Sequence, residues 1–327
     1  MDTIYIENEL LGTPRVTAIL NRFPNARTVE IDRYGDVFNA KNQNFRHQKK
    51  NPAMILARKQ GNRVLPTPPG YHIGGEHNYY FSHMLNCVYD CRYCFLQGMY
   101  QSANYVVFIN VDEFFNDIEA VMQTHNKPVW FFSGYDCDSL ALDPITHFID
   151  ECLEFFKHQP QAHLELRTKS TQIRSVLKHE SLPNAVVAYS LSPEPIVKAE
   201  EHGTPTLKKR LDALKTLQDS GWKIGLRFDP LLYATNFEQL YGAMFDEVFD
   251  TLDMSAVHSV SLGVFRLPVG FHKKLVRLYP DARLLNAPIE TRNAMASYPT
   301  QTENNMREFC MHKLQTAIRD DQFFPCS

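Results

Sequence analysis

The sequence predicts an α/β fold built on a parallel sheet. From residue 79 onward, short apolar runs typical of strands alternate with longer stretches of helical periodicity. The chain has 327 residues, 44% of them hydrophobic, which suits two average domains or one large α/β domain. Because strands that alternate with helices favour a parallel arrangement, we expect a parallel sheet with ligands at the carboxyl ends of its strands.

The elements of this alternation can be placed in order. We expect six strands, near 79–85, 129–132, 163–167, 186–191, 223–228 and 257–262. We expect helices near 112–123, 143–158, 171–178, 206–220 and 236–252. The helix at 206 is the best defined, because four leucines recur at helical spacing between Leu207 and Leu217 and Gly221 lies just beyond its end.

The two ends of the chain differ from this alternation. Residues 1–75 are interrupted by prolines and carry a basic bias, which predicts an extension packed on the main domain. The main domain is expected over 76–265. The mixed residues 266–327 form a C-terminal segment that is a candidate for DNA contact.

Charge limits the classes of partner. With 34 Lys and Arg against 37 Asp and Glu, the net charge of −3 argues against a surface that binds nucleic acid everywhere. Two local basic stretches, 41–63 and 266–283, remain. The second is interleaved with Phe271 and Tyr279, a pattern that suits either nucleic-acid contact or an amphipathic helix with a solvated face. No apolar run approaches 18 residues, so we expect no membrane partner and a cytoplasmic location.

The cysteines carry the strongest chemical signal. Seven cysteines are an odd number, and their clustering makes a poor disulfide framework. Cys87, Cys91 and Cys94 form a CxxxCxxC motif after the first strand, which indicates a metal site. Three thiolates can hold a [4Fe-4S] cube and leave one iron without a protein ligand. The alternative is zinc, with a fourth ligand from His83 or Cys137. The other three, Cys152, Cys310 and Cys326, are expected to be packing or surface thiols.

At these residues the sequence resembles the radical S-adenosylmethionine superfamily, and within it the spore photoproduct lyases. The loop CVYDCRYCFLQ (87–97) is similar to the lyases' CxxxCxYCYLQ. Four further blocks match in order and spacing: LELRTK (164–169), AYSLSP (188–193), EEHGTPTLKKRLDALKTLQDSGWKIGLRFDP (200–230) and VFRLPVGFHKKLVRLYPDARL (264–284). The resemblance covers roughly residues 30–290.

The resemblance implies a fold and an activity. The fold is a partial (β/α)6 barrel of the TIM type. The cofactors are a [4Fe-4S] cluster and S-adenosylmethionine, from which an electron supplied by a donor such as flavodoxin or ferredoxin releases a 5′-deoxyadenosyl radical. The reaction is repair of a thymine photoproduct in DNA by cleavage of a carbon–carbon bond. In such enzymes the protein positions and shields the cofactor.

The resemblance also assigns candidate site residues. Cys87, Cys91 and Cys94 would hold the cluster. Tyr93 would lie over the adenine, and Lys169, after the third strand, would contact the cofactor's carboxylate. Ser190 or Ser192, after the fourth strand, would be a further cofactor contact, and the motif does not choose between them.

The sequence departs from the lyases after the second strand. There the lyases place a cysteine that donates a hydrogen atom to the product radical, whereas this chain aligns Tyr135 with it and has Cys137 two residues further on. Phe95 replaces a tyrosine linked to returning that hydrogen, and phenylalanine has no O–H. Either Cys137 donates, or Tyr135 does, or the reaction ends differently.

The function therefore has open alternatives. The departures allow a radical enzyme that acts on another nucleic acid or a small molecule, and the cysteine motif alone would also fit a non-catalytic metal-stapled binding module. Gly74-Gly75-Glu76 looks like a cofactor motif but precedes the cysteines, which favours a turn. Arg227 and Asp229, after the fifth strand, either face the cavity at the strand ends or form a structural ion pair.

Overall fold

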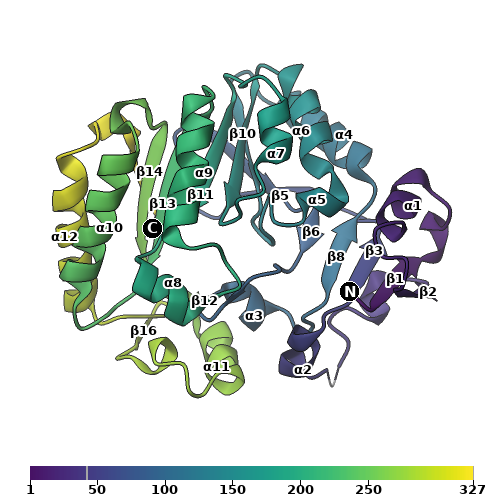
Figure 1. Cartoon of the computed structure of the whole chain (residues 1–327), viewed down its shortest axis with the longest axis horizontal. Helices are drawn as coiled ribbons and strands as arrows, with labels where there is room; N and C mark the ends of the chain where they lie inside the picture. Colours follow the sequence, from purple (N-terminus) through teal and green to yellow (C-terminus); the bar gives the residue numbers. More distant parts are fainter. Residues whose placement is uncertain (42, 327) are drawn as a thin grey trace.

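The larger of two main sheets is curved and made largely of parallel strands (Figure 1). The structure is a computed structural model that describes residues 1–41 and 43–326; Asn42 and Ser327, which fall in the predicted N-terminal extension and C-terminal segment, lie outside the described residues. In spatial order the sheet contains β18 (Phe323–Pro325), β14 (Ser259–Val264), β13 (Lys223–Leu231), β11 (Ala185–Ser190), β10 (Ala162–Thr168), β9 (Val129–Ser133), β5 (His77–Phe81) and β4 (Val64–Pro66).

This sheet confirms the predicted fold class. Strands β5, β9, β10, β11, β13 and β14 pair in parallel and in sequence order, as in a partial (β/α)6 barrel. Helices cover one face of the sheet (Figure 1). They are α4 (Val111–Met122), α5 (Asp143–Thr146), α6 (Phe148–Lys157), α7 (Arg174–Lys178), α9 (Leu207–Asp219), α10 (Phe237–Thr251) and α12 (Thr300–Gln315). Helix α8 (Glu194–Glu200) lies at the carboxyl ends of the strands, beside the short strand at Glu201–His202.

Two predicted elements are divided in the structure. The strand expected over 79–85 ends at Phe81, and Met84–Leu85 form β6 in the other sheet, because the intervening His83 turns inward to stack on Phe148 at 3.9 Å between ring centroids. The helix expected over 143–158 breaks between α5 and α6 at His147, whose φ of 52° is left-handed and cannot continue a helix.

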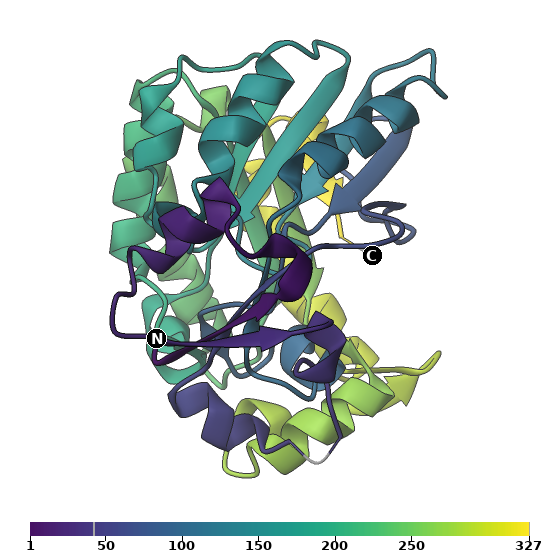
Figure 2. The same cartoon turned by 90° about the vertical axis from the view of Figure 1, so that its right-hand side faces the viewer.

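The N-terminal region forms a second sheet rather than an irregular extension. Its strand order is β2 (Arg27–Ile31), β1 (Thr3–Glu7), β3 (Met54–Ala57), β8 (Tyr105–Phe108) and β6. Helix α1 (Pro14–Leu20) packs on this sheet, which lies beside the barrel (Figures 1 and 2). Since β6 and β8 flank the cysteine loop in sequence, the small sheet supports that loop from both ends. The domain boundaries themselves stay a prediction.

Short elements close the carboxyl ends of the barrel strands (Figure 1). They are α2 (Phe45–Lys50), α3 (Phe95–Met99), α11 (Val269–Leu278), the paired β7 (Asp90–Cys91) and β12 (Glu201–His202), and the sheet of β15 (Arg266–Pro268), β17 (Met295–Ser297) and β16 (Glu290–Arg292). Helices α3 and α11 approach closely at Gly98, where an added Cβ would lie 2.6 Å from Phe271 Cβ. Larger residues at 98 would push α11 off the cysteine loop.

The Gly74-Gly75-Glu76 segment is a turn, as the sequence predicts. Gly74 and Gly75 have φ values of 98° and 84°, and a Cβ on Gly75 would come within 2.4 Å of the Trp130 ring. Glu76 lies at the surface and pairs with Lys127 at 2.5 Å. No helix among the described residues is long and apolar enough to cross a membrane.

A buried ion pair ties two barrel strands together. Glu165 on β10 and Arg227 on β13 pair at 2.8 Å with both side chains fully buried. Burial alone would raise the pKa of Glu165, but the guanidinium groups of Arg227 and Arg167 outweigh it and lower that pKa to about 2. The folded-state pKa is thus depressed, so the pair contributes stability above pH 4.5 that is lost as pH falls toward 2.

Replacing one partner should therefore destabilise the fold. We expect Arg227→Met to lower the free energy of unfolding by about 3–5 kcal/mol, because the Glu165 carboxylate stays buried without its main cation. Urea unfolding at neutral pH measures this. The control is Lys208→Met, which removes an exposed pair with Asp212 and should cost only about 0.3–0.5 kcal/mol. Equal effects of the two variants would contradict the assigned role.

Candidate active site

A cavity of about 500 Å³ opens at the carboxyl ends of the barrel strands. It contains all but one of the predicted site residues, contributed by four segments of the chain. Those that line it are Cys87, Cys91, Tyr93, Cys94, Tyr135, Cys137, Lys169 and Ser190. The loops that follow parallel strands all lie at the same edge of the sheet. Residues as far apart in sequence as Cys87 and Ser190, 103 positions, are therefore brought into one cavity.

The cysteine loop is anchored from outside the cavity. Lys49 Nζ donates hydrogen bonds to the carbonyl oxygens of Cys87 and Tyr89, both at 3.0 Å. Gln97 Nε2 donates to the carbonyl oxygen of Cys91 at 2.6 Å. The backbone between the first and second cysteines is therefore fixed by groups that the cluster does not use. Neither Lys49 nor Gln97 was expected from the sequence, since both act on backbone atoms and leave no spacing signature.

The three thiols supply the donor atoms that an iron–sulfur cluster requires. They carry no disulfide and border the cavity with their side chains largely buried. Among the described residues, no three metal-binding side chains converge tightly enough to hold one ion. A cube of four irons is wider than one ion, so its thiolates need not converge on a point. Of the two candidate fourth ligands for zinc, His83 packs in the core on Phe148 and does not line the cavity, whereas Cys137 does line it.

Burial sets the protonation of these thiols. It raises the pKa of Cys87 to about 12, with the Asp138 carboxylate adding to the effect. Burial likewise raises the pKa of Cys91 and of Cys94. Binding iron requires the thiolate form, so cluster assembly must release these protons.

Lys169 is held charged beside the cysteines. Its backbone N–H donates to Asp138 Oδ2 at 2.7 Å, and Thr168 Oγ1 donates to Asp138 Oδ1 at 2.6 Å. Burial alone would lower the pKa of Lys169, but the Glu201 carboxylate outweighs it and raises that pKa. The cavity therefore presents one fixed ammonium group, which suits a carboxylate ligand.

Tyr93 and Ser192 belong to a buried polar network around Glu201. The carboxylate accepts hydrogen bonds from the Tyr93 hydroxyl and from Ser192 Oγ, the latter at 3.1 Å, and pairs with the fully buried Arg210. Ser192 does not line the cavity, whereas Ser190 does. Of the two candidate serines, only Ser190 can reach a ligand there. Sequence reasoning missed Glu201 and Arg210, because Tyr93 lies 108 positions from Glu201 and the separation of nine residues between Glu201 and Arg210 is not a recognised motif.

The two candidate hydrogen donors occupy different parts of the cavity. Cys137 is buried and packs on residues of the smaller sheet, and burial raises the pKa of its thiol, with Cys87, Asp136 and Asp138 adding to the effect. Tyr135 is half-buried among other rings, with its own ring 4.4 Å from Tyr80 and 5.7 Å from Phe95 between centroids. Tyr135 thus lies beside the residue that replaces the lyases' tyrosine.

Cations near Tyr135 were not predicted as site residues. Arg167 lines the cavity and stacks over the Tyr71 ring at 4.7 Å, and Arg266 lines it opposite Asp229 at 3.5 Å. Cys326, expected only to pack, also lines the cavity, and its thiol donates to Asp229 at 3.1 Å.

Arg227 and Asp229 do not pair with each other. Arg227 is buried against Glu165, whereas Asp229 lines the cavity with Arg266. Residues two positions apart in a regular strand point to the same side, but the β13–β14 register shifts between Phe228 and Leu231. That irregularity, which the sequence does not reveal, separates the two side chains.

A partial parallel barrel with a CxxxCxxC loop at the carboxyl ends of its strands is the arrangement of radical S-adenosylmethionine enzymes. The profile of the spore photoproduct lyase family matches residues 76–319. The chain therefore belongs to the spore photoproduct lyase family, whose members are radical S-adenosylmethionine lyases.

Individual relatives agree with this assignment. The spore photoproduct lyase of Bacillus subtilis (strain 168) is 20% identical over 289 residues, covering 86% of this chain and 83% of its own. That of Geobacillus sp. (strain Y412MC61) is 24% identical over 169 residues, covering 51% and 50%. A solved spore photoproduct lyase mutant with bound AdoMet and dinucleoside spore photoproduct superposes with a TM-score of 0.85 at 17% identity, covering 100% and 98%.

Proposed function

We propose that this protein is a radical S-adenosylmethionine enzyme that repairs the spore photoproduct in DNA by carbon–carbon bond cleavage. The observation that carries the proposal is the single cavity shared by the three motif cysteines, Lys169 and Ser190. The family's named activity supports the substrate. A non-catalytic binding module, in which a metal ion only stabilises the fold, would not need a ligand-sized cavity beside its cysteines.

Each cofactor would be held by residues already described. Cys87, Cys91 and Cys94 would bind a [4Fe-4S] cluster, which supplies the electron that splits S-adenosylmethionine into methionine and a 5′-deoxyadenosyl radical. Lys169 would bind the carboxylate of S-adenosylmethionine, and Ser190 would donate a further hydrogen bond. Tyr93, locked by Glu201, would form a wall on the adenine side and keep water out.

The rest of the cavity would receive the lesion. Tyr71, Tyr135 and Phe95 offer ring faces for a flipped thymine pair, and Arg167 and Arg266 are cations that can meet its phosphates. Extrusion is least costly at damaged bases, which favours a lesion over intact DNA. We expect the protein to work in the cytoplasm.

Tyr135 is better placed than Cys137 to donate the hydrogen atom. Its ring lies 5.6 Å from that of Tyr71, over which Arg167 stacks, whereas Cys137 packs against the smaller sheet. Burial raises the pKa of Tyr135, and Tyr80 and Asp136 raise it further, so its hydroxyl keeps the hydrogen at neutral pH. The O–H bond of Tyr135 would break as a C–H bond forms on the thymine.

Lesion turnover tests the proposed function. Anaerobic incubation of reconstituted protein with irradiated DNA that contains spore photoproduct should restore thymines and consume S-adenosylmethionine. The control is the Lys169→Ala variant, which should bind S-adenosylmethionine about tenfold or more weakly because it loses a charge-assisted hydrogen bond. Cofactor cleavage without any change in the lesion would contradict the substrate and favour another nucleic acid or a small molecule.

A further inference from the structure

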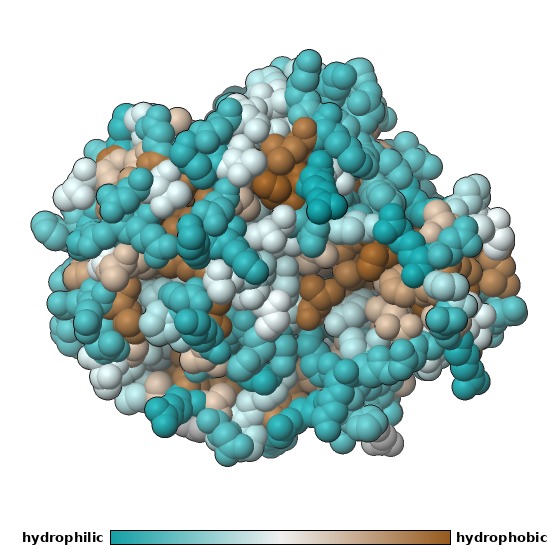
Figure 3. Space-filling view, viewed as in Figure 1, coloured by the Kyte–Doolittle hydropathy of each residue, from teal (hydrophilic) through white to brown (hydrophobic). Residues whose placement is uncertain are grey.

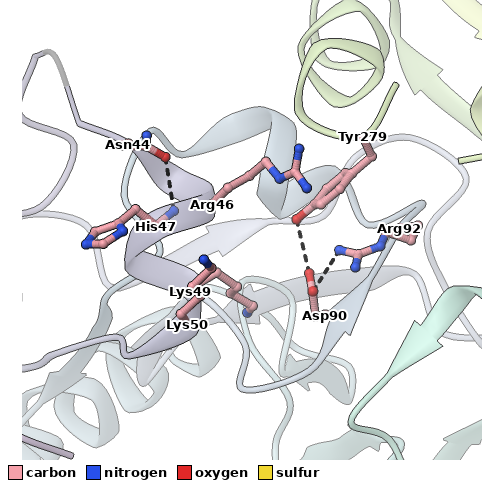
Figure 4. Close-up of a pocket in the computed structure, with 8 residues that line it drawn as sticks. All are labelled: Asn44, Arg46, His47, Lys49, Lys50, Asp90, Arg92 and Tyr279. Carbon is pink, nitrogen blue, oxygen red and sulfur yellow. Dashed lines mark hydrogen bonds and ion pairs between the residues drawn. The ribbon is translucent and has the colours of Figure 1, made fainter. Parts of the chain in front are cut away.

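A basic surface lies on the outside of the cysteine loop. Two adjoining depressions, of about 510 Å³ and 480 Å³, share Arg46, Arg92 and Tyr279. Figure 4 shows the cations of α2 around the depression that Arg92 and Tyr279 border. The surface over α2 is hydrophilic, whereas apolar side chains gather in a hollow nearer the middle of the molecule (Figure 3). We call this the outer basic surface; its cations are Arg46, Lys49, Lys50, Arg92 and Arg283.

The cysteine loop lies between the outer basic surface and the cavity and borders both of them. Along the cysteine loop, Cys91 and Tyr93 line the cavity, whereas Asp90 and Arg92 line the outer depression. This is the alternation of an extended strand, whose side chains point to opposite sides in turn. Lys49 crosses from α2 to bond the carbonyl oxygens of Cys87 and Tyr89. The outer surface is therefore separated from the cluster ligands by a single peptide strand.

We propose that the outer basic surface is the docking site of an acidic electron-donor protein, a flavodoxin or a ferredoxin. The inference rests on the proposed function, because a [4Fe-4S] cluster held by these cysteines must be reduced from outside. One electron would pass from the donor, which is oxidised, through the cysteine loop to the cluster, which is reduced, with no bond made or broken. Because electron transfer slows steeply with distance, we expect the donor to dock where the least protein separates it from the cluster.

Charge favours an acidic protein at this surface. Arg46, Lys50 and Arg283 form no ion pair with any residue that the structure describes. Unpaired cations at the rim of a depression steer an acidic partner toward it and raise its rate of association. The cavity is left free for the lesion, which would enter past Arg266 and Pro268 rather than through the cysteine loop.

The same surface suits DNA less well. Proteins that bind single strands stack bases on open aromatic faces. Tyr279, the aromatic residue shared by the two depressions, is only 7% exposed, has Arg92 over its ring at 4.0 Å, and donates its hydroxyl to Asp90 at 3.1 Å.

Charge reversal tests the docking site. The variant is Arg46→Glu/Lys50→Glu, two exposed residues of α2 outside the cavity; the matched control is Lys157→Glu/Lys209→Glu on α6 and α9. Binding of flavodoxin, and separately of ferredoxin, is titrated on the reconstituted full chain at low salt. Cleavage of S-adenosylmethionine is then measured with the reduced donor and with dithionite. Binding of irradiated DNA is measured in parallel.

We expect the variant to weaken donor binding and donor-driven cleavage about tenfold or more, while dithionite-driven cleavage and DNA affinity stay unchanged. The control should match the wild type. The proposal would be overturned by unchanged donor binding in the variant, or by a wild type that binds neither donor. A loss confined to DNA binding would also overturn it, because the surface would then bind DNA phosphates instead of a donor protein. Failure of the proposed function would appear differently, as a wild type that cleaves nothing even with dithionite.

Discussion

Cys91→Ala is expected to remove the iron–sulfur cluster and, with it, all cleavage of S-adenosylmethionine. Cys91 lies in β7, between the other two cysteines in sequence, and its thiol borders the cavity with 6% of the residue exposed. Two remaining thiolates would have to hold a cluster that, by the proposed assignment, is bound by three. Iron content, expected at about four per chain in the wild type, and visible absorbance after anaerobic reconstitution measure the loss.

Cys310→Ala is the matched control for this experiment. Cys310 is also a buried free thiol, but it lies on α12 in the hydrophobic core and does not line the cavity. It should keep its iron and its activity. Full iron content in Cys91→Ala, or equal loss in both variants, would contradict the assignment of the cluster to the CxxxCxxC loop. One zinc per chain in the wild type would do so as well.

Tyr135→Phe is expected to separate cofactor cleavage from repair. The substitution removes the hydroxyl, and with it the abstractable hydrogen, but keeps the ring that stacks on Tyr80. We expect the yield of restored thymine to fall about tenfold, equivalent to about 1.4 kcal/mol of barrier, while cleavage of S-adenosylmethionine continues. Chromatography of the digested DNA and of 5′-deoxyadenosine measures both quantities in one sample.

Cys137→Ala tests the other candidate donor in the same assay. Because Cys137 packs against the smaller sheet near Cys87, we expect this variant to lose some stability but to keep its yield of repaired thymine. A fall in yield for Cys137→Ala with full yield for Tyr135→Phe would reverse the assignment. Full yield in both variants would show that the hydrogen atom comes from elsewhere, with Cys326 as the remaining thiol in the cavity outside the cluster motif.

Much of the barrel follows from local sequence. The parallel strands and most of the helices are present near the predicted positions, because hydrophobic periodicity and helix-ending residues act over a few residues. Thr206 caps α9 with a hydrogen bond from Lys209 N, and Gly221 follows with a φ of 81°. The errors fall where a tertiary contact overrides the pattern, as at His83, whose stacking on Phe148 divides a predicted strand.

The N-terminal region shows the limit of local patterns. Its apolar runs are short and broken by proline, so they do not predict a sheet. Strand β1 is nonetheless fixed between β2 and β3, pairing Ile4 with Thr28 on one side and Met54 on the other. Such partners lie tens of residues apart, and pairing at that range depends on which faces the fold leaves to be buried.

Local sequence is enough to predict three thiols at CxxxCxxC spacing and an order of strands that brings their following loops together. Which side chains share the cavity becomes visible only in the folded chain. The fold placed Ser190 inside and Ser192 against Glu201, turned Arg227 into the core, and set a basic surface behind the cysteine loop. The physical reason is that ligand spacing and periodicity depend on residues close together in sequence. The direction of a side chain depends instead on partners far away in sequence that bury or neutralise it.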